Sequence, residues 1–223
     1  ANFDSIEYDE LINRTSDYLS NEKVIGWFQG RMEFGPRALG ARSILGDPRS
    51  DKMQKNLNLK VKYRESFRPF APSILREDLK DWFDIDVDSP YMLLVADINV
   101  EKQIKMNDEE KKLFGIDKLN IKRSEIPAVT HVNYSARIQT VNKNFNKRYY
   151  DLISKFKEKT GCPVIVNTSF NVRGEPIVNS PTDAFNCFMG TELDYLVIGD
   201  CILDKKKQNP SLKKDYKKRF ELD

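Results

Sequence analysis

Arginine and glycine are concentrated in one stretch near the start of the chain. Residues 30–49 contain four arginines and four glycines, with the apolar Leu39, Ile44 and Leu45 between them. Glycine lets a backbone approach a ligand closely, and a guanidinium group presents paired donors that match the oxygens of a phosphate or carboxylate. The pattern therefore predicts an anion-binding loop. The alternative, surface turns whose arginines are solvated or paired with acidic residues, stays open from this stretch alone.

A second group of cations lies at residues 62–72. Lys62, Arg64 and Arg68 occupy alternate or nearly alternate positions, and prolines at 69 and 72 keep the segment out of a helix. We expect an extended segment that projects the three side chains to one side. Lys62 would then be a mobile point charge and Arg68 a planar, forked donor. A solvated basic edge strand is the alternative.

Polar residues also follow a predicted buried strand over 163–166. Asn167 and Ser169 come directly after it, and Arg173 follows shortly afterwards. Polar groups at a strand end, beside an arginine, predict the second half of the same site. Ser169 is not expected to be a nucleophile, because the single histidine, His131, lies in another segment and no hydrolase elbow surrounds the serine.

Arg137 lies in a predicted strand over 136–141. Alternation places it on one face with Gln139, so that it can point at a ligand without disturbing the packed face. His131 is the one histidine, and the three cysteines lack metal-ligand spacing, which argues against a structural His/Cys metal centre. A lone histidine is usually structural, so His131 is only a weak candidate for the site.

The elements that must position these residues alternate between helices and strands. Helical periodicity covers residues 5–19 and 147–159, and a capping box at 180–183 opens a helix that ends at Gly190. A strand over 24–28 delivers the chain into the arginine-rich loop, which lacks the Gly-Lys-Ser/Thr ending of a Walker loop. Further strands are predicted over 91–96, 126–132 and 195–198, and residues 100–125 as an insertion or flap. The pattern predicts a mixed α/β or α+β domain over 1–203.

Four separated motifs, at 30–49, 62–72, 131–141 and 167–177, resemble those of a known family. It is the C-terminal domain of carbamoyltransferases of the nodulation and antibiotic-biosynthesis type, which includes the tobramycin and cephamycin carbamoyltransferases. The resemblance covers about residues 22–203. The relatives usually carry Asp-Gly where this chain has Asn133-Tyr134, which puts any role of that turn in doubt.

The resemblance implies a YrdC-like twisted sheet with flanking helices around a basic cavity. It implies that carbamoyl phosphate and ATP, with Mg²⁺, give carbamoyl adenylate, which passes to a separate N-terminal Kae1-like domain for transfer to an acceptor hydroxyl. That domain, with its iron site, is expected to be absent from this chain. At the matching positions, the residues implied to hold carbamoyl phosphate and carbamate are Arg37, Lys62, Arg68, Arg137, Asn167 and Ser169. Those implied to bind the nucleotide or its phosphates are Arg31, Arg42, Arg64 and Arg173.

Composition limits the other classes of function. The 223 residues suit one large domain, no apolar run approaches the ~20 residues of a membrane span, and no secretory signal is visible. Three cysteines suit a reducing cytoplasm. Residues 204–223 hold eight basic and four acidic side chains, so the net charge of +3 comes from a tail that we expect to be solvated. An RNA-binding module without catalysis remains the alternative, and it predicts a steep dependence of binding on salt.

Overall fold

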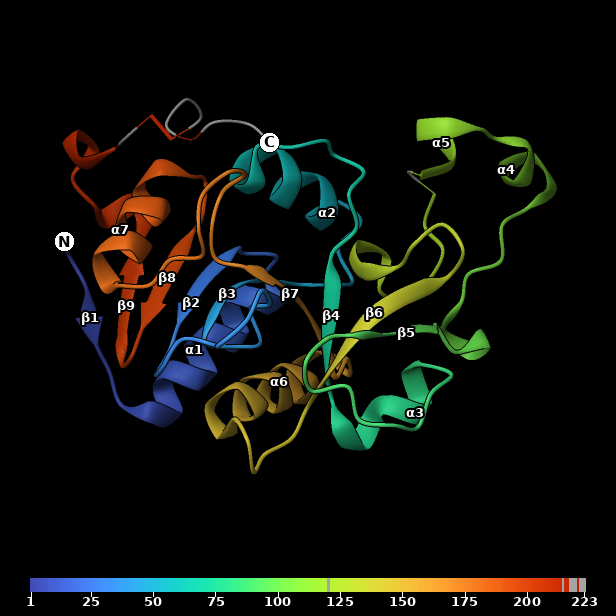
Figure 1. The fold of residues 1–223 in the computed structure, drawn as a ribbon, viewed down its shortest axis with the longest axis horizontal. Coiled ribbons are helices and arrows are strands. Elements are labelled where there is room, and N and C mark those ends of the chain that lie inside the picture. The colour runs from blue at the N-terminus through green and yellow to red at the C-terminus, as the bar shows by residue number, and fades with distance from the viewer. Residues whose placement is uncertain (120, 214, 217–219, 221–223) are drawn as a thin grey trace.

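The computed structural model describes residues 1–223 apart from 120, 214, 217–219 and 221–223 (Figure 1). Its strands form a nine-stranded sheet in the order β1-β9-β8-β2-β3-β7-β4-β6-β5. The strands are β1 Asp4–Ser5, β2 Ile25–Phe28, β3 Arg42–Gly46, β4 Ala71–Leu75, β5 Leu94–Asp97, β6 Ser135–Val141, β7 Val164–Ser169, β8 Tyr195–Ile198 and β9 Cys201–Asp204. The helices are α1 Tyr8–Ser20, α2 Met53–Asn56, α3 Leu79–Trp82, α4 Asp108–Lys112, α5 Gly115–Leu119, α6 Lys147–Thr160 and α7 Pro181–Gly190.

The sheet mixes strand directions. β2 pairs in parallel with β8, and β4 with β6, whereas β7, between β3 and β4, runs antiparallel to both of its neighbours. In this register Ser169 lies opposite Ser43 of β3, and Asn167 lies opposite Ala71 of β4. The polar end of β7 is therefore enclosed by a strand on each side.

The helices that cover the sheet follow the sequence signals. α1 and α6 lie side by side, and α7 packs against β8 and β2 (Figure 1). Ser180 forms the predicted capping box with Asp183 at the start of α7, and Gly161, at φ 74°, ends α6. The predicted mixed α/β architecture, a sheet with flanking helices, is confirmed. The more specific YrdC-like arrangement stays a prediction.

Two predicted strands differ in the structure. The segment 91–96 is not a buried strand: β5 begins at Leu94, lies at the sheet edge, and leaves Val95 62% exposed. The segment 126–132 is not a strand, because Pro127, which lacks an N–H, opens a 3-10 turn at Pro127–Val129. The apolar run in this segment predicts burial correctly, because Ile126 and Val129 are fully buried, but it does not predict the backbone conformation.

Two further segments lie outside the regular sheet. Residues 100–125 carry α4 and α5 and stand to one side of it (Figure 1), and Phe114 among them is 93% exposed. In the C-terminal segment 204–223, the chain forms single 3-10 turns at Lys205–Lys207 and Pro210–Leu212, and Tyr216 is buried. Much of the basic run of this tail lies outside the described residues. No helix in the described ranges is long and apolar enough to cross a bilayer.

Candidate functional site

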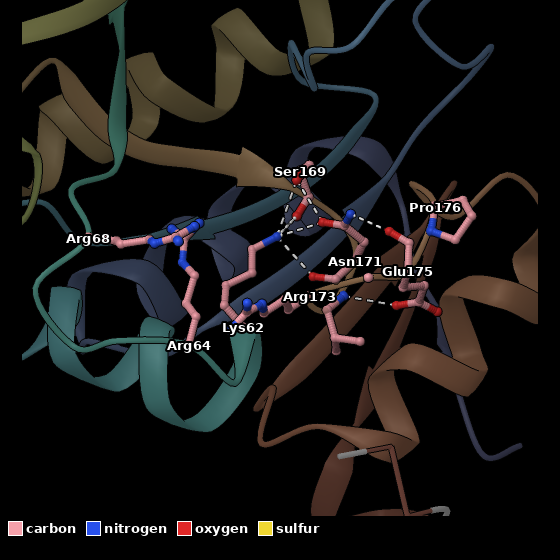
Figure 2. A pocket seen from close by; sticks show the side chains of 10 residues that line it. Lys62, Arg64, Arg68, Ser169, Asn171, Arg173, Glu175 and Pro176 are labelled. Carbon is pink, nitrogen blue, oxygen red and sulfur yellow. Dashed lines mark hydrogen bonds between the residues drawn. The ribbon is translucent and has the colours of Figure 1, made fainter. Parts of the chain in front are cut away.

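Two adjoining cavities open at the carboxyl end of β7. The larger, about 470 Å³, is lined by Lys62, Arg64, Arg68, Ser169, Asn171, Val172, Arg173, Gly174, Glu175 and Pro176 (Figure 2). The smaller, about 170 Å³, includes Arg37, Arg137 and Asn167 in its lining and shares Arg64 and Ser169 with the larger. The fold thus brings together eight of the ten predicted site residues, from four segments of the sequence.

Lys62 is buried in the wall of the larger cavity. It ends the π-helical turn Leu57–Lys62, and Tyr63 follows in a left-handed conformation at φ 51°, so the expected extended and mobile Lys62 is wrong. Its ammonium donates to the carbonyl and, at 3.2 Å, the hydroxyl of Ser169, and to the carbonyl and Oδ1 of Asn171 at 2.9 and 2.7 Å. Burial, reinforced by the charge of Arg64, lowers the pKa of Lys62 to about 7. This amine can therefore gain or lose a proton near neutral pH.

Arg64 lies where the two cavities meet. The fully buried Asn58 accepts its Nε–H at 2.7 Å and donates to the carbonyls of Ser66 and Arg68, which fixes the loop that carries both arginines. Burial, with the positive charge of the neighbouring Arg68, lowers the pKa of Arg64 to about 10. Arg68 itself pairs with Glu65 at 3.1 Å on the exposed rim.

The smaller cavity gathers cations without a described carboxylate in its lining. Arg37, Arg64 and Arg137 all line it, and none of the three forms an ion pair among the described residues. Burial, together with the charge of Arg37, lowers the pKa of Arg137. Arg37 Nε is buried and has no hydrogen-bond partner in the described part of the chain. A buried, unpaired donor of Arg37 in a cavity that two other guanidinium groups also line fits a bound anion.

A buried network of hydrogen bonds fixes Asn167, which lines the smaller cavity. Asn167 Nδ2 donates to Gln139 Oε1 at 2.8 Å, to the Ala38 carbonyl at 3.0 Å and to Ser73 Oγ at 3.1 Å. The fully buried Tyr149 donates to Ser73 Oγ at 2.9 Å. Asn167 is therefore held rigidly at the cavity wall, on strand β7, with its neighbours fixed by β4, β6 and α6.

Two predicted site residues lie elsewhere. The Arg42 guanidinium donates to the carbonyls of Gln29, Gly30 and Ala41 and stacks 3.5 Å from the ring centroid of Phe28, so it stabilises the loop and does not line either cavity. Arg31 is exposed and lines a separate cavity with Arg148 and Asp200. The sequence gives these arginines the same loop context as Arg37, but the fold separates them.

Several residues of the site were not predicted. Asn171 and Glu175 line the larger cavity, and Glu33 Oε1 accepts from the backbone N–H groups of Leu39 and Ala41 at 2.7 Å each, which holds the arginine-rich loop. Asn171 and Glu175 lie within the motif at 167–177, and this is the signal that could have found them. His131 is half-buried, and burial together with Arg137 lowers its pKa.

The donor set fits phosphate groups better than a resident metal ion. The two cavities present one amine and five guanidinium groups, which match phosphate oxygens. Among the described residues there is no group of three or more His, Cys, Asp or Glu side chains that could hold a metal.

Comparison with known proteins places these motifs in context. Residues 16–205 match the family described as Carbamoyltransferase C-terminus. The uncharacterized protein sll1178 of Synechocystis sp. is 56% identical over 225 residues, covering 100% of this chain and 36% of that protein. Nodulation protein NolNO of Sinorhizobium fredii is 40% identical over 205 residues, which cover 91% of this chain and 27% of that protein. The 3'-hydroxymethylcephem-O-carbamoyltransferase of Amycolatopsis lactamdurans is 35% identical over 195 residues, which cover 87% of this chain and 32% of that protein. The chain spans about a third of the length of these relatives.

Proposed function

This chain belongs to the family of carbamoyltransferase C-terminal domains, and from that premise we propose that its two cavities bind carbamoyl phosphate and ATP and form carbamoyl adenylate. The observation that carries the proposal is the smaller cavity, where Arg37, Arg64 and Arg137 meet without a described carboxylate and Arg37 Nε has no partner in the described part of the chain. Those donors suit the phosphate of carbamoyl phosphate. The larger cavity, which adjoins it through Arg64 and Ser169, suits the phosphates of ATP.

The proposed reaction needs charge stabilisation more than a side-chain nucleophile. Carbamoyl phosphate would first lose phosphate to water, and an oxygen of the resulting carbamate would attack the α-phosphorus of ATP with pyrophosphate as the leaving group. Negative charge develops on the phosphate oxygens in such a step, and fixed cations stabilise it. Lys62, Arg64, Arg68 and Arg173 line the larger cavity, where they can neutralise the leaving pyrophosphate. Magnesium would arrive with the nucleotide and add to that neutralisation.

Ser169 and Asn167 have a positioning role in this proposal. The Ser169 hydroxyl donates to Asn171 Oδ1 at 2.7 Å and accepts from the Lys62 amine at 3.2 Å, so its proton is directed at an amide oxygen and not at the amine. Asn167 has its amide nitrogen engaged by three acceptors, while its buried Oδ1 has no partner among the described residues. That free acceptor can receive the amide N–H of a carbamoyl group, which a plain phosphate lacks.

Transfer to an acceptor is proposed to need the further part that the longer relatives contain. Leu93, Leu94 and Val95 are 68%, 39% and 62% exposed at the edge of the sheet. They directly follow Met92, which is buried and lines the smaller cavity, and Val95 lies opposite Arg137 in the strand register. An exposed apolar edge beside the cavity suits docking of an N-terminal domain that receives the adenylate. We also propose a cytoplasmic location, where ATP is available.

The activation step can be tested with this chain alone. We expect pyrophosphate–ATP exchange that depends on carbamoyl phosphate, and calorimetric binding of carbamoyl phosphate that Arg137→Gln weakens at least tenfold, since it removes a charged hydrogen bond worth ~1.5–3 kcal/mol. Arg14→Gln, which breaks a surface pair with Asp4 and Glu10, is the matched control and should bind normally. Binding of a short RNA without binding of carbamoyl phosphate would refute the proposal. Carbamoylation of an acceptor hydroxyl by this chain alone would refute the need for a partner domain.

A further inference from the structure

We propose that the C-terminal segment positions the wall of the larger cavity, and that Tyr216 is its positioning residue. The tail is mostly basic and polar, yet Tyr216 is only 3% exposed, and its hydroxyl donates to Glu175 Oε1 at 2.9 Å. Glu175 is part of the cavity lining. The inference rests on the proposed function only in naming what occupies that cavity.

A short series of hydrogen bonds connects Tyr216 to Lys62. Glu175 Oε2 accepts from the Val172 N–H at 2.9 Å, and the Glu175 carbonyl accepts from Asn171 Nδ2 at 2.7 Å. The same Asn171 supplies two of the acceptors of the Lys62 ammonium. Figure 2 shows the hydrogen bonds from Lys62 to Asn171 and from Asn171 to Glu175. Glu175 therefore holds the loop over 171–175 in the conformation that fixes Lys62.

A second connection runs through the ring of Tyr216. The ring packs on Gly190 at the end of α7 so closely that a Cβ at Gly190 would lie 2.2 Å from the Cδ2 atom of Tyr216. The Gly190 carbonyl accepts the hydroxyl of Tyr63 at 2.8 Å, and Tyr63 directly follows Lys62. Tyr216 is thus connected to Lys62 by two routes, from its hydroxyl through the cavity residue Glu175 and from its ring through Gly190 and Tyr63.

The surroundings of Lys62 make the effect measurable. The ionisable groups that face it are Arg64, which lowers its pKa, and Glu175 and Cys187, which raise it, while burial is the largest influence and lowers it to about 7. Ser169 and Asn171 supply the hydrogen-bond acceptors. If the loop over 171–175 loosens, water reaches the amine, and its pKa moves up toward the ordinary value of 10.5.

The test compares Tyr216→Phe with Tyr8→Phe in the full chain. Both substitutions remove a tyrosine hydroxyl that donates to a carboxylate, because Tyr8 donates to Asp151 at 2.6 Å between α1 and α6, away from the cavities. We measure by calorimetry the affinity for a non-hydrolysable ATP analogue, which is the ligand class proposed for the larger cavity, and by NMR the titration of the Lys62 side chain, with the resonance assigned from Lys62→Met. Tyr216→Phe should weaken binding about threefold to tenfold and raise the Lys62 midpoint. Tyr8→Phe should change neither.

Each result decides the matter. If the two variants give the same affinity and the same Lys62 midpoint as the unsubstituted chain, the positioning role of Tyr216 is refuted. If the unsubstituted chain fails to bind the ATP analogue, the proposed function is refuted, and the Lys62 midpoint of Tyr216→Phe alone still decides the role of the tail. A loss of thermal stability shared by both variants, without a change at Lys62, also counts against the proposal.

Discussion

Replacing Lys62 by methionine should change how the stability of the protein depends on pH. Burial lowers the pKa of this amine from 10.5 to about 7 in the folded chain, while the unfolded chain keeps the ordinary value. Between these two values the unfolded state binds more protons than the folded state, so the free energy of unfolding rises with pH. One pKa unit corresponds to ~1.4 kcal/mol, and integration from pH 7 to 9 gives a rise of about 2 kcal/mol. The methionine variant lacks this contribution.

The assay is urea unfolding of both proteins at pH 7, 8 and 9. The informative quantity is the difference between their free energies of unfolding, because other groups titrate equally in both. Lys205, whose pKa burial lowers to about 8, and Cys162, whose pKa burial raises, are two such groups. Relative to Lys62→Met, the unsubstituted chain should gain about 2 kcal/mol from pH 7 to pH 9.

Sulfate provides a second arm, because it does not titrate in this range. An anion in the cavity favours the protonated amine, so sulfate should stabilise the unsubstituted chain more at pH 7 than at pH 9 and should affect Lys62→Met less. Parallel pH dependences of the two proteins would refute the reasoning. They would mean that the oxygens of Ser169 and Asn171 compensate the buried charge fully and that the ammonium keeps its ordinary pKa.

Two further substitutions test the loop that precedes β3. Gly40→Ala should destabilise the protein by about 3 kcal/mol, because Gly40 has φ 107° and an added Cβ would lie 2.4 Å from the buried ring of Tyr149. Gly199→Ala is the control and should cost about 1 kcal/mol, because Gly199 has φ 54° but an added Cβ there meets open space. Urea unfolding compares the two variants. Equal effects would contradict the packing argument. Arg37→Lys keeps the charge but loses the fork and should weaken carbamoyl phosphate binding about tenfold in calorimetry, whereas Arg76→Lys on the surface should bind normally. Unchanged affinity of Arg37→Lys would place that side chain outside the site.

Local sequence rules predicted the elements whose cause is local. The stripe of apolar residues on α6 predicts its buried face, with Tyr149, Leu152 and Phe156 fully buried. The capping box at Ser180 predicts the start of α7 because both of its hydrogen bonds join residues three apart. The strand signal over 163–166 likewise located the polar end of β7 and, with it, Asn167 and Ser169.

Which of the arginines line a cavity, and the burial of Lys62, depend on contacts between residues that are distant in the sequence. Arg37 and Arg42 lie five positions apart in the same arginine-rich stretch, yet Arg42 donates to carbonyls of the segment after β2, and Arg37 lines the smaller cavity with Arg137 of β6. Lys62 is buried because Ser169 and Asn171, more than a hundred residues away, supply its acceptors. Residue type and spacing show neither the separation of Arg37 from Arg42 nor the burial of Lys62, because a solvated cation would have the same local sequence pattern.

The cations left unpaired by the fold are the ones that argue for a ligand. Burying Arg137 beside Arg37, and Arg64 beside Arg68, costs free energy through lost hydration and mutual repulsion, and the lowered pKa values of Arg137 and Arg64 reflect that cost. A protein could relieve it with carboxylates, as Asp78 does for Lys157 and Asp47 for Arg49 elsewhere in this chain. In the smaller cavity no described residue does so. An anionic substrate is the group that would relieve the repulsion, so the energy lost in building the cavity would be recovered when that substrate binds.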